Sequence, residues 1–300
     1  MKVEYKNRAE WLHNRRELIT ASDVAAILGW DDRRSPLDVY ASKITGSEIS
    51  DNDAMLLGRC LEGGIATAYA EKTGRQVLAT NGFTMWFHDS FPWLAATPDR
   101  LIFKENTVDF SRPPETGAPL EIKHAGWMKR RDWEDDAPLF VQIQLQIQMA
   151  CMGAQWGAFC GVVGGAEIHY GDLDLNQPFI DTTIEKLDEF RWRLKNSRPP
   201  EPTMARDLRA VKKLFPLDSG KTVDLSDEYK SLADQWETAK QLSKENDGRA
   251  EELESKIRAA IGGATFATLP DGTVLSLKTT ARKGYTCEVK PTTYRTLRRK

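Results

Sequence analysis

Cysteine is scarce in this sequence and never clustered. The 300 residues contain four cysteines, at positions 60, 151, 160 and 287, and no two of them form a CxxC pair. This spacing argues against a zinc site, a disulfide framework and an iron–sulfur cluster. We therefore expect free thiols in a reducing compartment.

Long apolar runs and an excess of one charge are also missing. No segment approaches the ~18 consecutive apolar residues of a membrane span, and residues 1–6 are not followed by the apolar run of a signal peptide. We therefore expect a cytoplasmic protein with no membrane contact. The net charge is only −2, so a role on nucleic acid would need a local basic surface. With 40% hydrophobic and 29% charged residues, the chain can bury a substantial core.

The first quarter of the chain carries helix signals. Ser35 is a suitable N-cap, Pro36 fits the first helical position and Gly46 can end the same helix. These signals and the apolar periodicity predict helices over residues 6–15, 22–28, 35–45 and 53–73.

The middle of the chain changes to short apolar or aromatic segments separated by turn residues, which indicate strands. These segments are 82–88, 93–97, 101–104, 120–124 and a hairpin of 155–163 with 166–170. Residues 106–117 are predicted to form an exposed loop, and residues 178–195 a helix. Residues 141–149 alternate strictly between apolar and polar, as a strand does. A helix is nevertheless favoured, because Asp136 can cap it and the apolar positions share one helical face.

The proline-rich segment 197–202 predicts a domain boundary. We expect a domain over 1–200, a linker over 201–225 and an extension over 226–300. The extension has a heptad-like helical stretch over 226–261, although residues 246–248 could be a turn that makes it a helical hairpin. A β-hairpin is predicted about residues 270–272, before a tail in which residues 278–300 carry eight basic side chains and one acidic.

Two short motifs can carry chemistry. Glu121 and Lys123 alternate with Ile122 on a predicted strand, so they emerge on one face while Ile122 points into the core. A divalent ion would compensate a carboxylate placed there. Asp99, which follows Pro98, adds a second hard oxygen ligand suited to Mg²⁺ or Mn²⁺. The Ile122 carbonyl is a further candidate ligand.

Pro98-Asp99 followed by Glu121-Ile122-Lys123 matches the PD-(D/E)xK nuclease signature. The signature alone is short, and a surface ion pair between Glu121 and Lys123 explains it equally well. Three neighbouring segments make the resemblance more specific: residues 11–24, 58–62 and 144–154. In this order the chain resembles the YqaJ-like viral recombinases and lambda-type exonucleases, from about Trp11 to Pro200. The resemblance implies a restriction-endonuclease-like α/β (α+β) core, with a central mixed sheet flanked by helices.

The resemblance also implies roles for individual residues. Asp99, Glu121, the Ile122 carbonyl and Glu62 would bind two Mg²⁺ ions, and Lys123 would orient or deprotonate the attacking water. Gln144 would hold that water or the lysine, although it can equally be one polar position of an amphipathic helix. Arg15 and Ser22 would bind a terminal 5′-phosphate, which a forked guanidinium and a serine near a helix start can do. An ordinary N-cap serine beside a solvated arginine is the alternative.

By resemblance, the function would be that of a phage-type or prophage-encoded recombination nuclease in a bacterial host. It would degrade one strand of linear double-stranded DNA 5′ to 3′ and leave 3′ single-stranded tails for an annealing protein. The resemblance also implies a homo-oligomer, a trimeric ring. Two alternatives stay open: a metal-dependent, structure-specific endonuclease, and a catalytically silent DNA-binding or adaptor module. The basic tail suits DNA backbone contacts, and a solvated terminus explains it as well.

Overall fold

The computed structural model describes residues 1–46, 52–103, 117–281, 283–284 and 291–298. These residues fall into two compact units, Met1–Pro216 and Leu217–Lys300. The predicted loop over 106–117 lies almost entirely outside the described residues, as do Cys287 and half of the basic side chains of the tail. No helix in the described ranges is both long and apolar enough to cross a membrane.

The helices of the first unit begin and end close to the predicted positions. They are α1 (Arg8–Glu17), α2 (Ala21–Ile27), α3 (Pro36–Thr45) and α4 (Asp53–Thr73). In α3, the Asp38 amide donates to Ser35 Oγ at 3.1 Å, Pro36 occupies the first turn, and Gly46 ends the helix at φ 64°. The left-handed φ favours glycine there.

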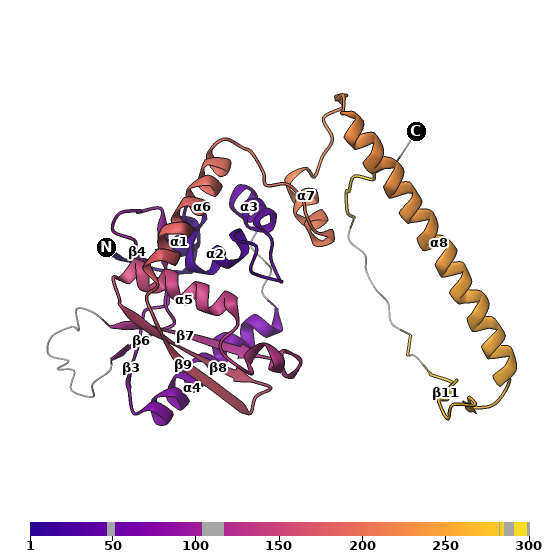
Figure 1. The fold of residues 1–300 in the computed structure, drawn as a ribbon, viewed down its shortest axis with the longest axis horizontal. Helices are drawn as coiled ribbons and strands as arrows, with labels where there is room; N and C mark the ends of the chain where they lie inside the picture. Colours follow the sequence, from indigo (N-terminus) through magenta and orange to yellow (C-terminus); the bar gives the residue numbers. More distant parts are fainter. Residues whose placement is uncertain (47–51, 104–116, 282, 285–290, 299–300) are drawn as a thin grey trace. The chain divides into compact units, whose positions relative to one another are not determined.

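The strands of the first unit divide between two sheets (Figure 1). The larger sheet has the order β3-β6-β7-β8-β9, and its pairs are antiparallel except for β7 with β8. Its strands are β3 (Gln76–Ala79), β6 (Arg100–Phe103), β7 (Ala118–Ala125), β8 (Trp156–Val163) and β9 (Glu167–Asp174). The smaller sheet has the order β1-β4-β5-β2. It contains β1 (Lys2–Glu4), β2 (Ile19–Thr20), β4 (Thr84–Phe87) and β5 (Leu94–Ala96). Two of the predicted strands, 82–88 and 93–97, thus belong outside the central sheet.

Helices cover both faces of the larger sheet. On one face, Ile65 and Tyr69 of α4 pack with Ile122 and Cys160. On the other, Val141 and Leu145 of α5 (Leu139–Met152) pack with Phe159. The alternation of β7 and β8 therefore presents Ile122 to α4, whereas Glu121 lies on the side of α5.

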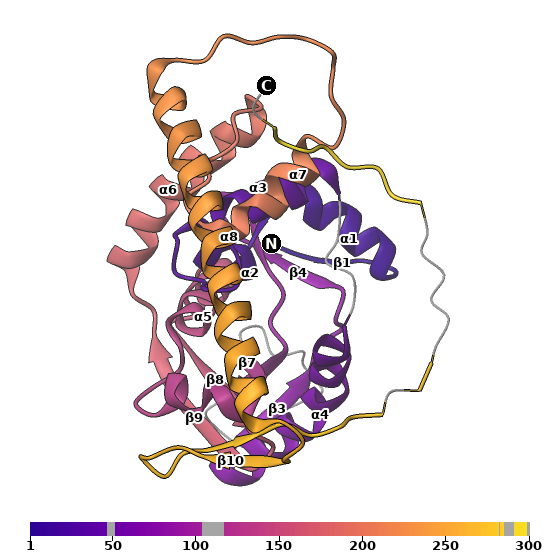
Figure 2. The ribbon, with the colours of Figure 1, turned by 90° about the vertical axis from the view of Figure 1, so that its right-hand side faces the viewer.

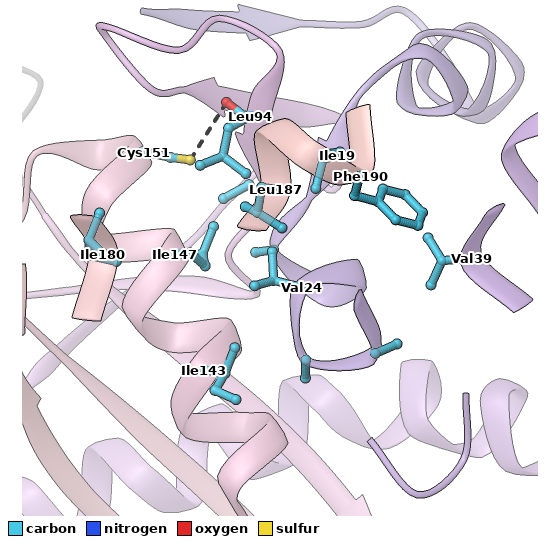
Figure 3. Close-up of a cluster of buried hydrophobic side chains, with 14 of the residues drawn as sticks. Ile19, Val24, Val39, Leu94, Ile143, Ile147, Cys151, Ile180, Leu187 and Phe190 are labelled. Carbon is cyan, nitrogen blue, oxygen red and sulfur yellow. Dashed lines mark hydrogen bonds between the residues drawn. The ribbon is translucent and has the colours of Figure 1, made fainter. Parts of the chain in front are cut away.

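The core continues from α5 into the helical layer. Ile143, Ile147 and Cys151 pack against α2, β5 and α6 (Gln177–Lys195), as Figure 3 shows. The Cys151 thiol lies 3.7 Å from the Leu94 carbonyl oxygen, so this cysteine is a buried core residue. The 3-10 helix η1 (Trp127–Trp133), which the sequence did not predict, follows β7.

The first unit extends beyond the predicted boundary at 197–202. After η2 (Ala205–Asp207), helix α7 (Leu208–Leu214) packs Ala210, Val211 and Leu214 against Leu37 and Ala41 of α3. The predicted linker over 201–225 therefore contains a helix that completes the first unit.

The second unit is built on one long helix, α8 (Asp227–Ile261) (Figures 1 and 2). It runs without interruption through residues 246–248, so the alternative of a helical hairpin is not found. The predicted tail hairpin is confirmed as β10 (Phe266–Thr268) paired antiparallel with β11 (Val274–Ser276).

Candidate active site

Asp99, Glu121 and Lys123 come together at the larger sheet. Glu121 is fully buried in β7, and Lys123, two residues further along the same strand, donates a hydrogen bond to its Oε1. Asp99 lies in the turn before β6, and its Oδ2 accepts the Ile122 amide at 2.7 Å. The strand alternation expected from the sequence brings Glu121 and Lys123 together, and the bond to the Ile122 amide adds Asp99.

Helix α5 adds two glutamines that are one turn apart. Lys123 Nζ donates to Gln144 Oε1 at 3.3 Å, and Gln148 Nε2 donates to Glu121 Oε2 at 2.5 Å. Gln148 is fully buried, and its Oε1 is without a hydrogen-bond partner among the described residues. Gln148 was not predicted, although its place one turn after Gln144 puts it on the same helix face.

Glu62 of α4 reaches the same region through an arginine. Arg100 donates one hydrogen bond to Glu62 Oε1 and a second, of 2.6 Å, to the carbonyl oxygen of Asp99. The predicted acidic residue on α4 is thus connected to Asp99. Arg100 itself was not predicted, although it adjoins Asp99 in the sequence.

The charges of the site are unevenly balanced. Burial, and next the negative charge of Glu121, raise the pKa of Asp99 well above its ordinary value. Burial alone would lower the pKa of Lys123, but Glu121 and Asp99 outweigh it and the pKa is raised. Lys123 is therefore protonated in the absence of a metal, and Asp99 forms no ion pair of its own within the described part of the chain.

The site fits a divalent cation in its donor set and its charge. Within the described residues, no three Asp, Glu, His or Cys side chains gather into a ready-made metal cluster. The reason is visible in the contacts: both Glu121 oxygens face Lys123 and Gln148, and Glu62 faces Arg100. The carboxylate oxygens are nonetheless hard ligands of the kind that Mg²⁺ or Mn²⁺ prefers, and a divalent cation would compensate the negative charge of Asp99.

A second polar cluster joins α1, α2 and α3. Arg15 Nη2 donates to Ser22 Oγ at 2.6 Å, so the structure brings these two predicted residues together. Beside them the buried Asp23 carboxylate accepts from Lys43 at 2.8 Å and from Arg34 at 3.1 Å. The charges of Lys43, Arg34 and Arg15 thus all act on the Asp23 carboxylate.

The two clusters are connected through α1 and the loop after α2. The Arg15 guanidinium lies 4.9 Å from the centre of the Trp11 ring. Trp11 Nε1 donates to Thr97 Oγ1 at 3.4 Å, two residues before Asp99. From the loop, Arg34 binds Asp23 while the charge of Arg33 acts on Lys123.

The mixed sheet, with Asp99 and a Glu-x-Lys strand facing α5, has the arrangement of a PD-(D/E)xK nuclease core. Residues 10–155 match the model of the YqaJ-like viral recombinase domain. The chain is 23% identical over 269 residues to the uncharacterized protein YqaJ of Bacillus subtilis (strain 168), across 87% of this chain and 80% of the relative.

Two solved structures are similar in fold. An alkaline exonuclease (LHK-Exo) from Laribacter hongkongensis has a TM-score of 0.49 at 21% identity, over 69% of this chain and 100% of that one. A phage-related exonuclease from Haemophilus somnus 129PT has a TM-score of 0.42 at 10% identity, over 60% of this chain and 94% of that one.

Proposed function

We propose that this protein is a divalent-metal-dependent deoxyribonuclease that degrades one strand of linear duplex DNA 5′ to 3′ and leaves 3′ single-stranded tails. The observation that supports it most is the buried Glu121 carboxylate, which accepts from Lys123 and Gln148, with the Asp99 carboxylate held on the Ile122 amide of the same strand. An ordinary surface ion pair would need neither the burial of Glu121 nor a glutamine beneath it.

Four groups would hold the metal: the carboxylates of Asp99, Glu121 and Glu62 and the Ile122 carbonyl. Mg²⁺, as one or two ions, supplies Lewis-acid activation of water and stabilises the negative charge that develops on the phosphate. The chain's own contribution is positional. Gln148 fixes the rotamer of Glu121, and the Ile122 amide holds one oxygen of Asp99.

Lys123 acts in this proposal as a hydrogen-bond donor. In the absence of a metal, Glu121 and Asp99 raise its pKa against the effect of burial. Its Nζ, which donates to Glu121 and Gln144, can orient a water molecule and stabilise a negatively charged oxygen. Gln144 accepts from Lys123 and so directs the ammonium. Of the two roles expected for Lys123, water orientation is the one that these contacts favour.

Arg15 and Ser22 are proposed to bind the 5′-terminal phosphate, with Arg34 as a neighbouring cation. Arg15 and Ser22 are joined by a hydrogen bond of 2.6 Å, and Arg34 and Lys43 lie beside them on Asp23, so donor groups and cations are gathered at one place. This assignment explains why the enzyme would act from 5′ ends. A trimeric ring and an annealing partner remain proposals taken from the family.

The test compares a 5′-phosphorylated linear duplex with a closed circle of the same sequence, in Mg²⁺, Ca²⁺ or EDTA. We expect nucleotide release from the linear DNA in Mg²⁺ alone, and none with Lys123→Ala. The exposed Lys186 of α6 provides the matched control, since Lys186→Ala should cleave like the parent. Cleavage of the circle would instead indicate an endonuclease, and binding that EDTA leaves intact without any cleavage would indicate an adaptor.

The 5′-phosphate assignment is tested separately. Removing the Arg15 guanidinium should cost the binding of a phosphate about 1.5–3 kcal/mol, or roughly 10- to 100-fold. Arg15→Ala should therefore slow degradation of 5′-phosphorylated ends by that factor while leaving 5′-hydroxyl ends nearly unchanged. An equal loss on both ends would contradict a phosphate-binding role.

A further inference from the structure

Helix α8 exposes an apolar stripe that the second unit does not bury. The helix is 35 residues long and contains no buried residue. Tyr229, Leu232, Leu253 and Ile257 are each about half exposed, at 51, 50, 45 and 46%. A helix that long with half-exposed large apolar side chains usually has a partner.

The stripe keeps a seven-residue register from one end of α8 to the other. One position of the repeat holds Tyr229, Trp236, Ser243, Ala250 and Ile257, and the other holds Leu232, Ala239, Asn246, Leu253 and Ala260. A 3.5-residue period of this kind is the sequence pattern of two helices that pack along a common seam. The two polar residues lie together at the centre, with apolar residues on both sides.

We propose that α8 pairs with α8 of a second copy of this chain as an antiparallel two-stranded coiled coil. The antiparallel register places Leu232 opposite Ile257 of the second copy, and Trp236 opposite Leu253. It places Ser243 opposite Asn246, so the polar residues face each other at the dyad and form no unpaired polar layer. This association is independent of DNA cleavage.

The charges beside the seam decide between the two orientations. In the antiparallel pair, Lys240 lies beside Asp247 and Glu254 of the second copy, and Glu228 lies beside Lys256. In a parallel pair, the one contact between opposite charges is Arg249 with Glu254 of the second copy, and the apolar Leu242 lies beside Asp247. The antiparallel pair thus has three kinds of opposite-charge contact against one like-charge contact, between the two copies of Asp247, so the charges favour the antiparallel orientation.

Two contacts within the second unit bear on the proposal. Lys240 Nζ lies 4.6 Å from the centre of the Trp236 ring, which keeps that lysine at the edge of the seam. Leu297 and Arg298 of the tail line a surface hollow together with Trp236 and Leu242. The tail of the same chain is thus the competing occupant of the stripe.

Disulfide trapping of the full chain tests the register. In a background with Cys60→Ser and Cys287→Ser, a Leu232→Cys chain is co-expressed with an Ile257→Cys chain carrying a different tag. The antiparallel pair predicts a covalent dimer between the two variants and none within either alone. In that pair the two copies of position 232 are about 38 Å apart, at 1.5 Å per residue. A covalent dimer of Leu232→Cys with itself would overturn the proposal.

Light scattering tests the association itself. Leu253→Glu should raise the dissociation constant of the α8 pair at least tenfold, whether that pair joins single chains or trimeric rings, whereas Gln241→Glu, which adds the same charge on the opposite helix face, should leave it unchanged. Circular dichroism checks that both variants keep their helix. A chain ending at Gly263 should associate like the parent. If the full chain does not associate through α8 and only the truncated chain does, the tail covers the stripe and the proposal fails.

Discussion

At the scale of single residues, the candidate active site depends on the hydrogen bonds that hold Glu121. Its Oε1 accepts from Lys123 and its Oε2 from Gln148, and the side chain is fully buried. Both oxygens are therefore fixed before any ligand binds. Such preorganisation is what a site built for charge stabilisation requires.

Gln148→Ala tests this positioning. Loss of a residue that orients a metal ligand costs roughly 10- to 100-fold in metal affinity or activity. We expect the Mg²⁺ concentration for half-maximal cleavage to rise by that factor, with normal folding by circular dichroism. Gln146→Ala is the matched control. Gln146 lies on the same helix as Gln148, but it donates to the backbone carbonyl of Asp174 in β9 and not to Glu121. An unchanged Mg²⁺ requirement in Gln148→Ala would contradict the positioning role.

The shared strand face of Glu121 and Lys123 could be predicted, because strand alternation needs only the residues themselves. The sequence predicted Gln144 but missed Gln148, because four glutamines alternate along one segment. Only the rotation of α5 against β7 decides which of them reaches Glu121, and that rotation is set by packing. Arg100 was missed for a similar reason, since its partner Glu62 lies on a distant helix.

At the scale of elements, α5 explains why residues 141–149 look like a strand. Residues in a helix advance by 100°, so Val141, Leu145 and Met149 form one stripe. Ile143 and Ile147 form a second stripe about 200° away. The first packs on the larger sheet and the second on α2 and α6. A helix buried on two opposite sides therefore produces the alternation of a strand. The shared apolar face gave the correct assignment, whereas the expected cap was wrong: the N-cap position is Pro138, and the Asp136 side chain does not cap the helix.

The ion pairs of Asp23 join α2 to α3 and lead to a second prediction. Asp23 and Lys43 are 4 and 8% exposed, and removal of one partner of a buried pair costs about 3–5 kcal/mol. Asp23→Asn should lower the free energy of unfolding by that amount in urea denaturation. The exposed pair Glu189–Arg193 is the control, and Glu189→Gln should cost less than about 1 kcal/mol. Equal costs for the two variants would contradict this account.

The same pair gives a pH dependence. Burial alone would raise the pKa of Asp23, but Lys43, Arg34 and Arg15 outweigh it and hold the pKa far below its ordinary value. A depressed carboxyl pKa stabilises the fold above the ordinary value of about 4 and loses that contribution as the pH falls below it. The parent should therefore lose stability more steeply below pH ~4 than Asp23→Asn does.

At the scale of the whole molecule, the two units differ in how far the sequence defined them. The spacing of apolar residues and the helix-capping residues predicted the positions of most helices and strands of the first unit. The predicted end of the first unit, at residues 197–202, lies before the end found in the structure, Pro216. A proline-rich segment looks like a domain boundary in the sequence even when the helix after it packs against the preceding domain, as α7 does. The contact that decides is Ala210 of α7 between Leu37 and Ala41, which is a long-range contact.

Truncation distinguishes the two boundaries. A chain ending at Pro216 keeps α7 on α3, whereas one ending at Pro200 exposes Leu37 and Ala41, which are 2 and 1% exposed in the structure. Exposing one large and one small apolar side chain costs about 2–4 kcal/mol, which is roughly 5–10 °C in melting temperature for a unit of this size. We expect residues 1–216 to melt cooperatively and residues 1–200 to melt earlier by that amount. Ala210→Asp in the longer chain should reproduce most of the loss, because it separates α7 from α3 without shortening the chain. Equal melting temperatures for all three chains would show that α7 contributes nothing to the first unit.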